Sequence, residues 1–70
     1  MKIIEINTGF IKLDSLLKFA GITESGGVAK NIISQGDVIL NNEKCLIRGK
    51  KIYPGDVVKV GDTELEVRGA

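Results

Sequence analysis

The strongest constraint on the fold of this chain is a pair of apolar stripes at helical spacing, each followed by a glycine. The members of the first stripe are Leu13, Leu16, Leu17 and Ala20. The members of the second stripe are Val28, Ala29, Ile32 and Ile33. Recurrence at i, i+3, i+4 and i+7 predicts two short amphipathic helices, which Gly21 and Gly36 are expected to end. The helices are joined by a short connection, so we expect them to pack against each other, with a further element covering their other flank.

The rest of the chain alternates extended segments with turn residues. Strands are expected at Lys2–Ile6, Val38–Leu40, Glu43–Ile47, Ile52–Tyr53, Val57–Val60 and Thr63–Arg68. The turns between them carry Asn41-Asn42, Pro54-Gly55-Asp56 and Gly61-Asp62, residue types that suit tight turns. The sequence therefore predicts an α+β fold, with two packed helices against a small antiparallel or mixed sheet.

Length and cysteine content limit the class of protein. With 70 residues the chain has room for one domain, 1–70, with a thin core. No apolar run approaches the roughly 18 residues of a membrane span, and Glu5 interrupts the only apolar stretch near the N-terminus. Cys45 is the single cysteine, which excludes an intramolecular disulfide and a cysteine cluster for zinc. We therefore expect a cytosolic monomer with no cofactor, metal or small-molecule substrate.

Charge is segregated along the chain although the formal net charge is only +1. Between residues 44 and 59 the one acid is Asp56, and the five basic residues are Lys44, Arg48, Lys50, Lys51 and Lys59. Acidic residues crowd the last expected strand instead. Such segregation is typical of a surface that meets a polyanion.

The start of the second helix is unusual because it carries two glycines. Ser25 is the expected N-cap, and Gly26 and Gly27 follow it, with Lys30 one turn later. Glycine costs about 1 kcal/mol relative to alanine inside a helix, so the pair marks either a sterically required turn or bare backbone that admits a phosphate.

Residues 11–58 resemble the S4-type RNA-binding domain, which is built on the αL motif. The matching features are Leu13-Asp14 and Leu17, the segment Ser25 to Ile33 with its Ala29-Lys30 pair, Gly36 before Val38, Asn41-Asn42, Arg48, and Lys51-Ile52 with Gly55-Asp56-Val57-Val58. The Gly26-Gly27 form of the second helix and the N-terminal strand look most like the small stand-alone bacterial members, the YaaA/YbcJ-like group. The resemblance implies a bacterial, ribosome-associated module that binds structured ribosomal or transfer RNA.

Charge and resemblance together place the RNA-binding surface at the two helix starts and at the basic segment from Lys44 to Lys51. The expected RNA-binding residues are Lys12, Ser25, Gly26, Gly27, Lys30, Arg48, Lys50 and Lys51. The chain departs from the family pattern at Gly26, where many members carry a cation, and at Lys12, which lacks the bidentate fork of an arginine. Base stacking has little support in the sequence, since the aromatic residues are only Phe10, Phe19 and Tyr53. Recognition of RNA by phosphate contacts and shape is therefore expected.

Two other classes of function fit the sequence less well. An enzyme is disfavoured because the chain has no histidine, Cys45 has no base partner, and Gly26 to Lys30 lacks the glycine and Ser/Thr of a phosphate-binding loop. We expect no catalytic residue. The alternative is a protein-interaction or sulfur-carrier module of the β-grasp type. Such carriers end in a glycine pair, whereas this sequence ends Arg68-Gly69-Ala70.

Overall fold

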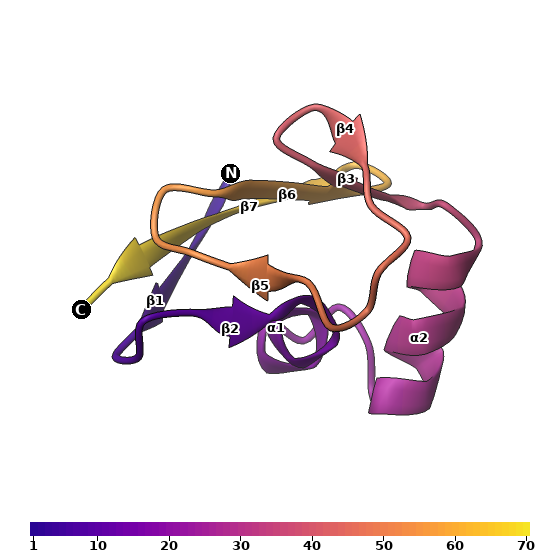
Figure 1. The fold of residues 1–70 in the computed structure, drawn as a ribbon, viewed down its shortest axis with the longest axis horizontal. Coiled ribbons are helices and arrows are strands. Elements are labelled where there is room, and N and C mark those ends of the chain that lie inside the picture. The colour runs from indigo at the N-terminus through magenta and orange to yellow at the C-terminus, as the bar shows by residue number, and fades with distance from the viewer.

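The expected α+β architecture is confirmed in a computed structural model that describes residues 1–70. The helices are α1 (Leu13–Phe19) and α2 (Gly26–Ser34). The strands are β1 (Lys2–Ile6), β2 (Ile11–Lys12), β3 (Val38–Leu40), β4 (Glu43–Lys44), β5 (Lys51–Ile52), β6 (Val57–Val60) and β7 (Thr63–Gly69). Figure 1 shows both helices on the same side of the larger sheet.

The larger sheet is mixed and has the strand order β1-β7-β6-β3-β4. β1 runs parallel to β7, and the other neighbours are antiparallel. A second sheet contains only β2 and β5, which pair antiparallel. Because β2 leads directly into α1, this small sheet fixes where that helix begins.

Both helices end as their sequences predict. After α1 the amide of Gly21 donates to the Lys18 carbonyl at 3.0 Å, and the amide of Ile22 donates to the Leu17 carbonyl at 3.0 Å. This pair of bonds is a Schellman motif, and the same motif closes α2 through Gly36, whose φ is +82°. The two glycines therefore fix where the helices end.

Asp14 and Lys18 lie four residues apart on α1 but form no ion pair. The one ion pair in the structure joins Arg68 and Glu66. The Asp14 carboxylate instead accepts a hydrogen bond from the Ser15 amide at 2.7 Å, within the first turn of α1. The carboxylate therefore stabilises the start of α1, because it lies near the positive end of the helix dipole.

The β3–β4 hairpin turns at Asn41 and Asn42, which both have positive φ, 49° and 71°. Asparagine tolerates this region better than most residues, so the expected tight turn is confirmed. The expected return strand Glu43–Ile47 is longer than the observed one. The Cys45 amide still bonds to the Val38 carbonyl at 3.0 Å, but the chain then leaves the sheet to reach α1.

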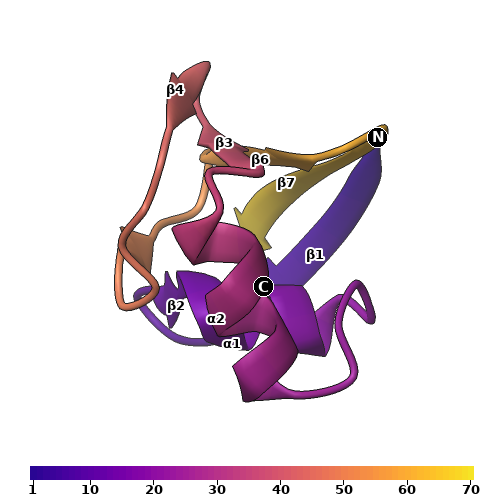
Figure 2. The same ribbon diagram turned by 90° about the vertical axis from the view of Figure 1, so that its right-hand side faces the viewer.

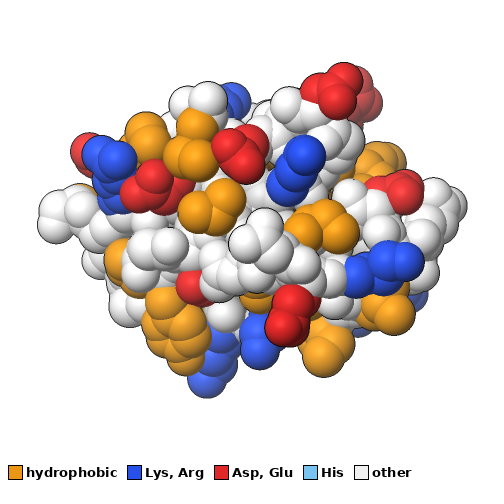
Figure 3. Space-filling view, turned by 90° about the horizontal axis from the view of Figure 1, so that it is seen from above, with side chains coloured by type: hydrophobic (Ala, Val, Ile, Leu, Met, Phe, Trp, Pro, Cys, Tyr) orange, Lys and Arg blue, Asp and Glu red, His pale blue; other side chains and the backbone are white.

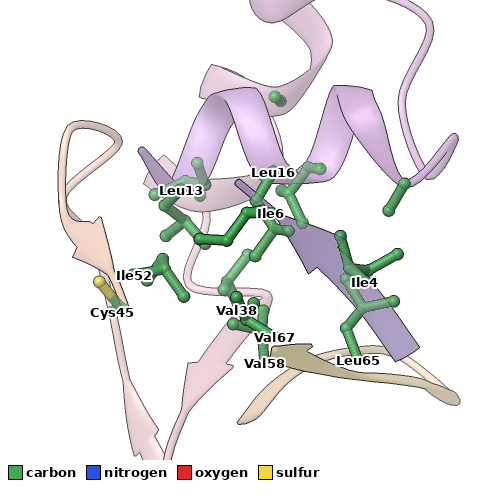
Figure 4. Packing of buried hydrophobic residues seen from close by; sticks show 14 residues of the cluster. Ile4, Ile6, Leu13, Leu16, Val38, Cys45, Ile52, Val58, Leu65 and Val67 are labelled. Atoms are coloured by element: carbon green, nitrogen blue, oxygen red, sulfur yellow. The ribbon is translucent and has the colours of Figure 1, made fainter. Parts of the chain in front are cut away.

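The core lies between α1 and the larger sheet (Figure 4). Leu13 and Leu16 of α1 face strand residues such as Val38, Val58 and Val67, all with no exposed surface. Ile52 of β5 closes the side next to Cys45. Both helices and the strands β1, β3, β5, β6 and β7 contribute to this cluster, so α1, the small sheet and the larger sheet hold one another in place.

Candidate nucleic-acid interface

The loop Arg48–Lys51, here called the basic loop, is bonded to the start of α1. The Leu13 amide donates to the Lys50 carbonyl at 2.9 Å, and the Asp14 amide donates to the Arg48 carbonyl at 3.1 Å. A helix leaves its first amides without intrahelical partners, and the Lys12 side chain supplies no cap here. The loop carbonyls therefore act as the cap. They fix the basic loop beside α1, as Figures 1 and 2 show.

The small sheet adds two lysines to this place. Lys12 of β2 and Lys51 of β5 are directly opposite each other in the antiparallel pair, and both are exposed. Like charges opposite each other in a sheet are unfavourable. Neither lysine has an acidic partner within ion-pair distance. A bound anion would relieve this repulsion.

Four expected cations therefore gather around the start of α1. They are Lys12, Arg48, Lys50 and Lys51, and all four side chains are exposed and without an ion pair. Asp14 is the acid at the start of α1, and its carboxylate accepts a hydrogen bond from the Ser15 amide. Glu43 and Asp56 lie on the other side of Lys50 and Lys51, toward the β3–β4 hairpin. The amides of Leu13, Asp14 and Ser15 are all occupied. An anion at this end of α1 would consequently meet side-chain cations rather than backbone donors.

At the start of α2 the free groups are backbone amides, whereas at the start of α1 they are side-chain cations. The Ser25 hydroxyl accepts a hydrogen bond from the Val28 amide at 3.4 Å, as expected for the N-cap. The amides of Gly26 and Gly27 have no partner within the chain, and both residues are exposed. Lys30, one turn later, is exposed as well. Backbone donors, rather than side chains, dominate this site.

The structure gives no steric reason for the two glycines. A Cβ atom at Gly26 would meet nothing within 4 Å, and one at Gly27 would meet only the Ser25 Oγ at 3.9 Å. Neither residue has a positive φ. The interpretation as a sterically required turn therefore loses its basis, which leaves the bare backbone as the feature to explain.

The eight expected residues thus form two groups rather than one continuous cluster. Lys12, Arg48, Lys50 and Lys51 are tied together by the small sheet and the loop bonds. Ser25, Gly26, Gly27 and Lys30 lie at the start of α2. Both groups lie on the helical side of the molecule (Figures 1 and 2), but no hydrogen bond or ion pair joins them. Their joint action on one ligand stays a prediction.

The sequence did not indicate an aromatic pair beside the basic loop. The ring centroids of Phe10 and Tyr53 are 6.1 Å apart at an interplanar angle of 53°, and Lys51 Nζ lies 4.8 Å from the Phe10 centroid. Pairing of β2 with β5 places these residues together, because Phe10 precedes β2 and Tyr53 follows β5. The contact between the two rings could not be predicted because β2 was not expected from the sequence.

The opposite side of the molecule differs in character. Figure 3 shows the face of the larger sheet turned away from the helices, where basic and acidic side chains alternate with apolar ones and no patch has one sign. No group of three or more His, Cys, Asp or Glu side chains is placed to hold a metal ion. Neither helix has the length and apolar character needed to cross a membrane.

Comparison with known proteins covers nearly the whole chain. A family model described as S4 domain matches residues 4–68. A curated relative from Bacillus subtilis (strain 168), described as "Probable ribosome maturation protein RlbA", is 44% identical over 57 residues, which cover 81% of this chain and 80% of the relative. The family match includes both helices and the basic loop.

Proposed function

This chain belongs to the S4 domain family, and from that premise we propose that it is a non-catalytic module that binds structured RNA through phosphate contacts and shape. Residues 1–70 act as one S4-like domain with its motif core at 11–58. The Bacillus subtilis relative carries the name of a probable ribosome maturation protein, so ribosomal RNA is a better candidate than transfer RNA. We infer a monomer that acts in the cytoplasm.

The observation that carries the proposal is the set of unpaired cations around α1. Lys12 and Lys51 are held opposite each other by strand pairing, and the backbone bonds from Arg48 and Lys50 fix the loop. Because the backbone that carries these cations is already fixed, only their side chains lose freedom when they meet a ligand. Neutralisation of phosphates by such side chains releases condensed counterions, which drives RNA binding at moderate salt.

The chemistry of the two groups favours folded RNA over a catalytic role. Side chains around α1 supply charge, and the free amides of Gly26 and Gly27 supply donors for an oxygen anion. None of these groups is a nucleophile with a neighbouring base. Two phosphate-binding groups at separate positions on the helical side suit a backbone whose path is fixed by RNA folding.

A charge-removal variant tests this function. We expect Arg48→Gln, Lys50→Gln and Lys51→Gln together to weaken binding to a structured ribosomal RNA fragment, measured by fluorescence anisotropy over a series of KCl concentrations. Removal of one phosphate-neutralising side chain lowers the slope of log K against log[KCl] by about 0.7 to 0.9. The triple variant should therefore lower the slope by about 2 to 3.

The chain offers a matched control. Lys18→Gln, Lys59→Gln and Arg68→Gln also remove two lysines and one arginine, all exposed and outside both groups. Both triple variants change the formal net charge from +1 to −2, since 1 − 3 = −2. We expect the control to keep most of the wild-type slope. Equal losses in the two variants would reject the proposed surface and leave only non-specific attraction.

A further inference from the structure

A hollow of about 410 Å³ lies beside the basic loop, between the β3–β4 hairpin and β5. Its lining includes Asn41, Glu43, Lys50, Lys51, Tyr53 and Asp56. It therefore combines one aromatic ring, two lysines of the basic loop, the Asn41 amide and two carboxylates. The oxygens of the Asp56 carboxylate already accept hydrogen bonds from Asn41 and from the Tyr53 amide, which leaves Glu43 as the one acid of the lining without a partner in the chain. An aromatic ring beside cations is the combination that binds unpaired nucleotides in proteins.

The backbone of Tyr53 is fixed by bonds on both sides. Its amide donates to Asp56 Oδ2 at 2.8 Å, and its carbonyl accepts from the Asp56 amide at 3.0 Å. Asp56 Oδ1 in turn accepts from Asn41 Nδ2 at 3.0 Å, and Asn41 Oδ1 accepts from the Val57 amide at 2.9 Å. This network attaches the turn that carries Tyr53 to the hairpin turn across the hollow.

The ring of Tyr53 is supported and yet accessible. Phe10 packs against it, while 49% of the Tyr53 surface stays exposed. Lys51 Nζ lies over the Phe10 ring, so that the lysine is held next to the aromatic pair by a cation–π contact. The Tyr53 hydroxyl forms no hydrogen bond within the chain and can bond a base edge or a 2′-hydroxyl.

We propose that this hollow binds one unpaired nucleotide of the RNA, with its base stacked on Tyr53 and its flanking phosphates against Lys50 and Lys51. This inference rests on the proposed function and adds an unpaired base to the recognition of phosphates and shape. A fully paired helix keeps its bases inside the stack, so it fills the cation sites but leaves Tyr53 uncovered. An RNA with a bulge or loop next to a helix can contact the cations with its phosphates and cover Tyr53 with its unpaired base.

The test compares two RNA hairpins that differ by one unpaired nucleotide, with the bulged nucleotide being 2-aminopurine. Tyr53 is the only tyrosine and the chain has no tryptophan, so its emission reports on the site directly. The bulged hairpin should quench both Tyr53 and 2-aminopurine and should bind about five-fold or more tightly than the paired hairpin. The paired hairpin, which has no bulged 2-aminopurine, should bind without quenching the emission of Tyr53.

Variants assign the preference to the ring. Tyr53→Leu should remove the advantage of the bulged hairpin, and Tyr53→Phe should keep most of it because a phenyl ring still stacks. Phe19→Leu is the matched control, since Phe19 is an exposed aromatic residue outside the hollow, with 66% of its surface accessible at the end of α1. Far-UV circular dichroism checks the fold of each variant. The wild-type and Tyr53→Phe results decide the question even if Tyr53→Leu is unstable.

The outcomes separate the two proposals. Equal binding of both hairpins without quenching, with the charge dependence intact, would overturn the nucleotide site and leave the proposed function standing. An unchanged preference in a folded Tyr53→Leu variant would also overturn it. Absence of binding to either hairpin and to the ribosomal RNA fragment would overturn both.

Discussion

The substitution Gly26→Pro separates the backbone donor at the start of α2 from the flexibility of the glycine. Gly26 is the first helical residue after the N-cap Ser25, and proline is favoured at that position because its fixed φ suits a helix start. Ser25 has φ −148° and ψ 163°, the extended conformation that a residue before proline prefers. The Gly26 amide is unbonded within the chain, and a Cβ there meets nothing within 4 Å.

The expected effect on stability is favourable. Replacement by proline where the native backbone already fits it stabilises a protein by about 0.4 to 1 kcal/mol, because the unfolded chain loses freedom. For a domain of this size, 1 kcal/mol raises Tm by about 4 to 8 °C. We therefore expect Gly26→Pro to raise Tm by a few degrees, measured by thermal circular dichroism.

The expected effect on RNA binding has the opposite sign. Proline lacks the N–H that we propose as a phosphate donor, and a net hydrogen bond contributes about 1 kcal/mol, or a factor of about five in affinity. Gly26→Ala is the control, because it keeps the amide and raises helix propensity. Lower stability of Gly26→Pro would refute the description of the α2 start. Equal RNA affinity of the proline and alanine variants would refute the amide as a phosphate contact.

Two further predictions concern the scaffold. Asp56→Ala should lower the free energy of unfolding by about 1 to 3 kcal/mol in urea, since the carboxylate accepts from the Tyr53 amide and from Asn41; an unchanged value would show that these bonds do not hold the turn. Leu16→Ala should lower it by about 2 to 5 kcal/mol, because Leu16 has no exposed surface. Val28→Ala, at a site 46% exposed, is the control and should change it by much less; similar losses in the two variants would contradict the placement of the core.

The helices could be predicted from the sequence because their signals are local. The apolar stripes of α1 and α2, the Ser25 cap and the two terminal glycines all lie within the segment that they shape. The Asn41-Asn42 turn is equally local. The length of the strand after this turn was overestimated because its end depends on the bonds of the basic loop to α1, which lie elsewhere in the fold.

The positive charge of the candidate site could be predicted from the sequence, but the arrangement of its residues in space could not. Segregation of lysines indicated the basic loop, whereas its capping of α1 depends on the carbonyls of Arg48 and Lys50, which carry no sequence signal. β2 has only two residues and exists through its pairing with β5, so neither it nor the Phe10–Tyr53 contact could be expected from a periodic pattern.

The parallel pairing of β1 with β7 has a consequence for the order of events during synthesis. In its register Lys2 lies opposite Leu65, which is 65 − 2 = 63 positions later. β1 therefore has no strand to pair with until β7 has left the ribosome, although both helices have been synthesised by then. Contacts this distant in sequence slow folding and leave apolar strands unprotected meanwhile. A nascent chain stalled before β7 would present Ile4 and Ile6 to solvent, and early release from synthesis would yield a substrate for proteolysis rather than a smaller working domain.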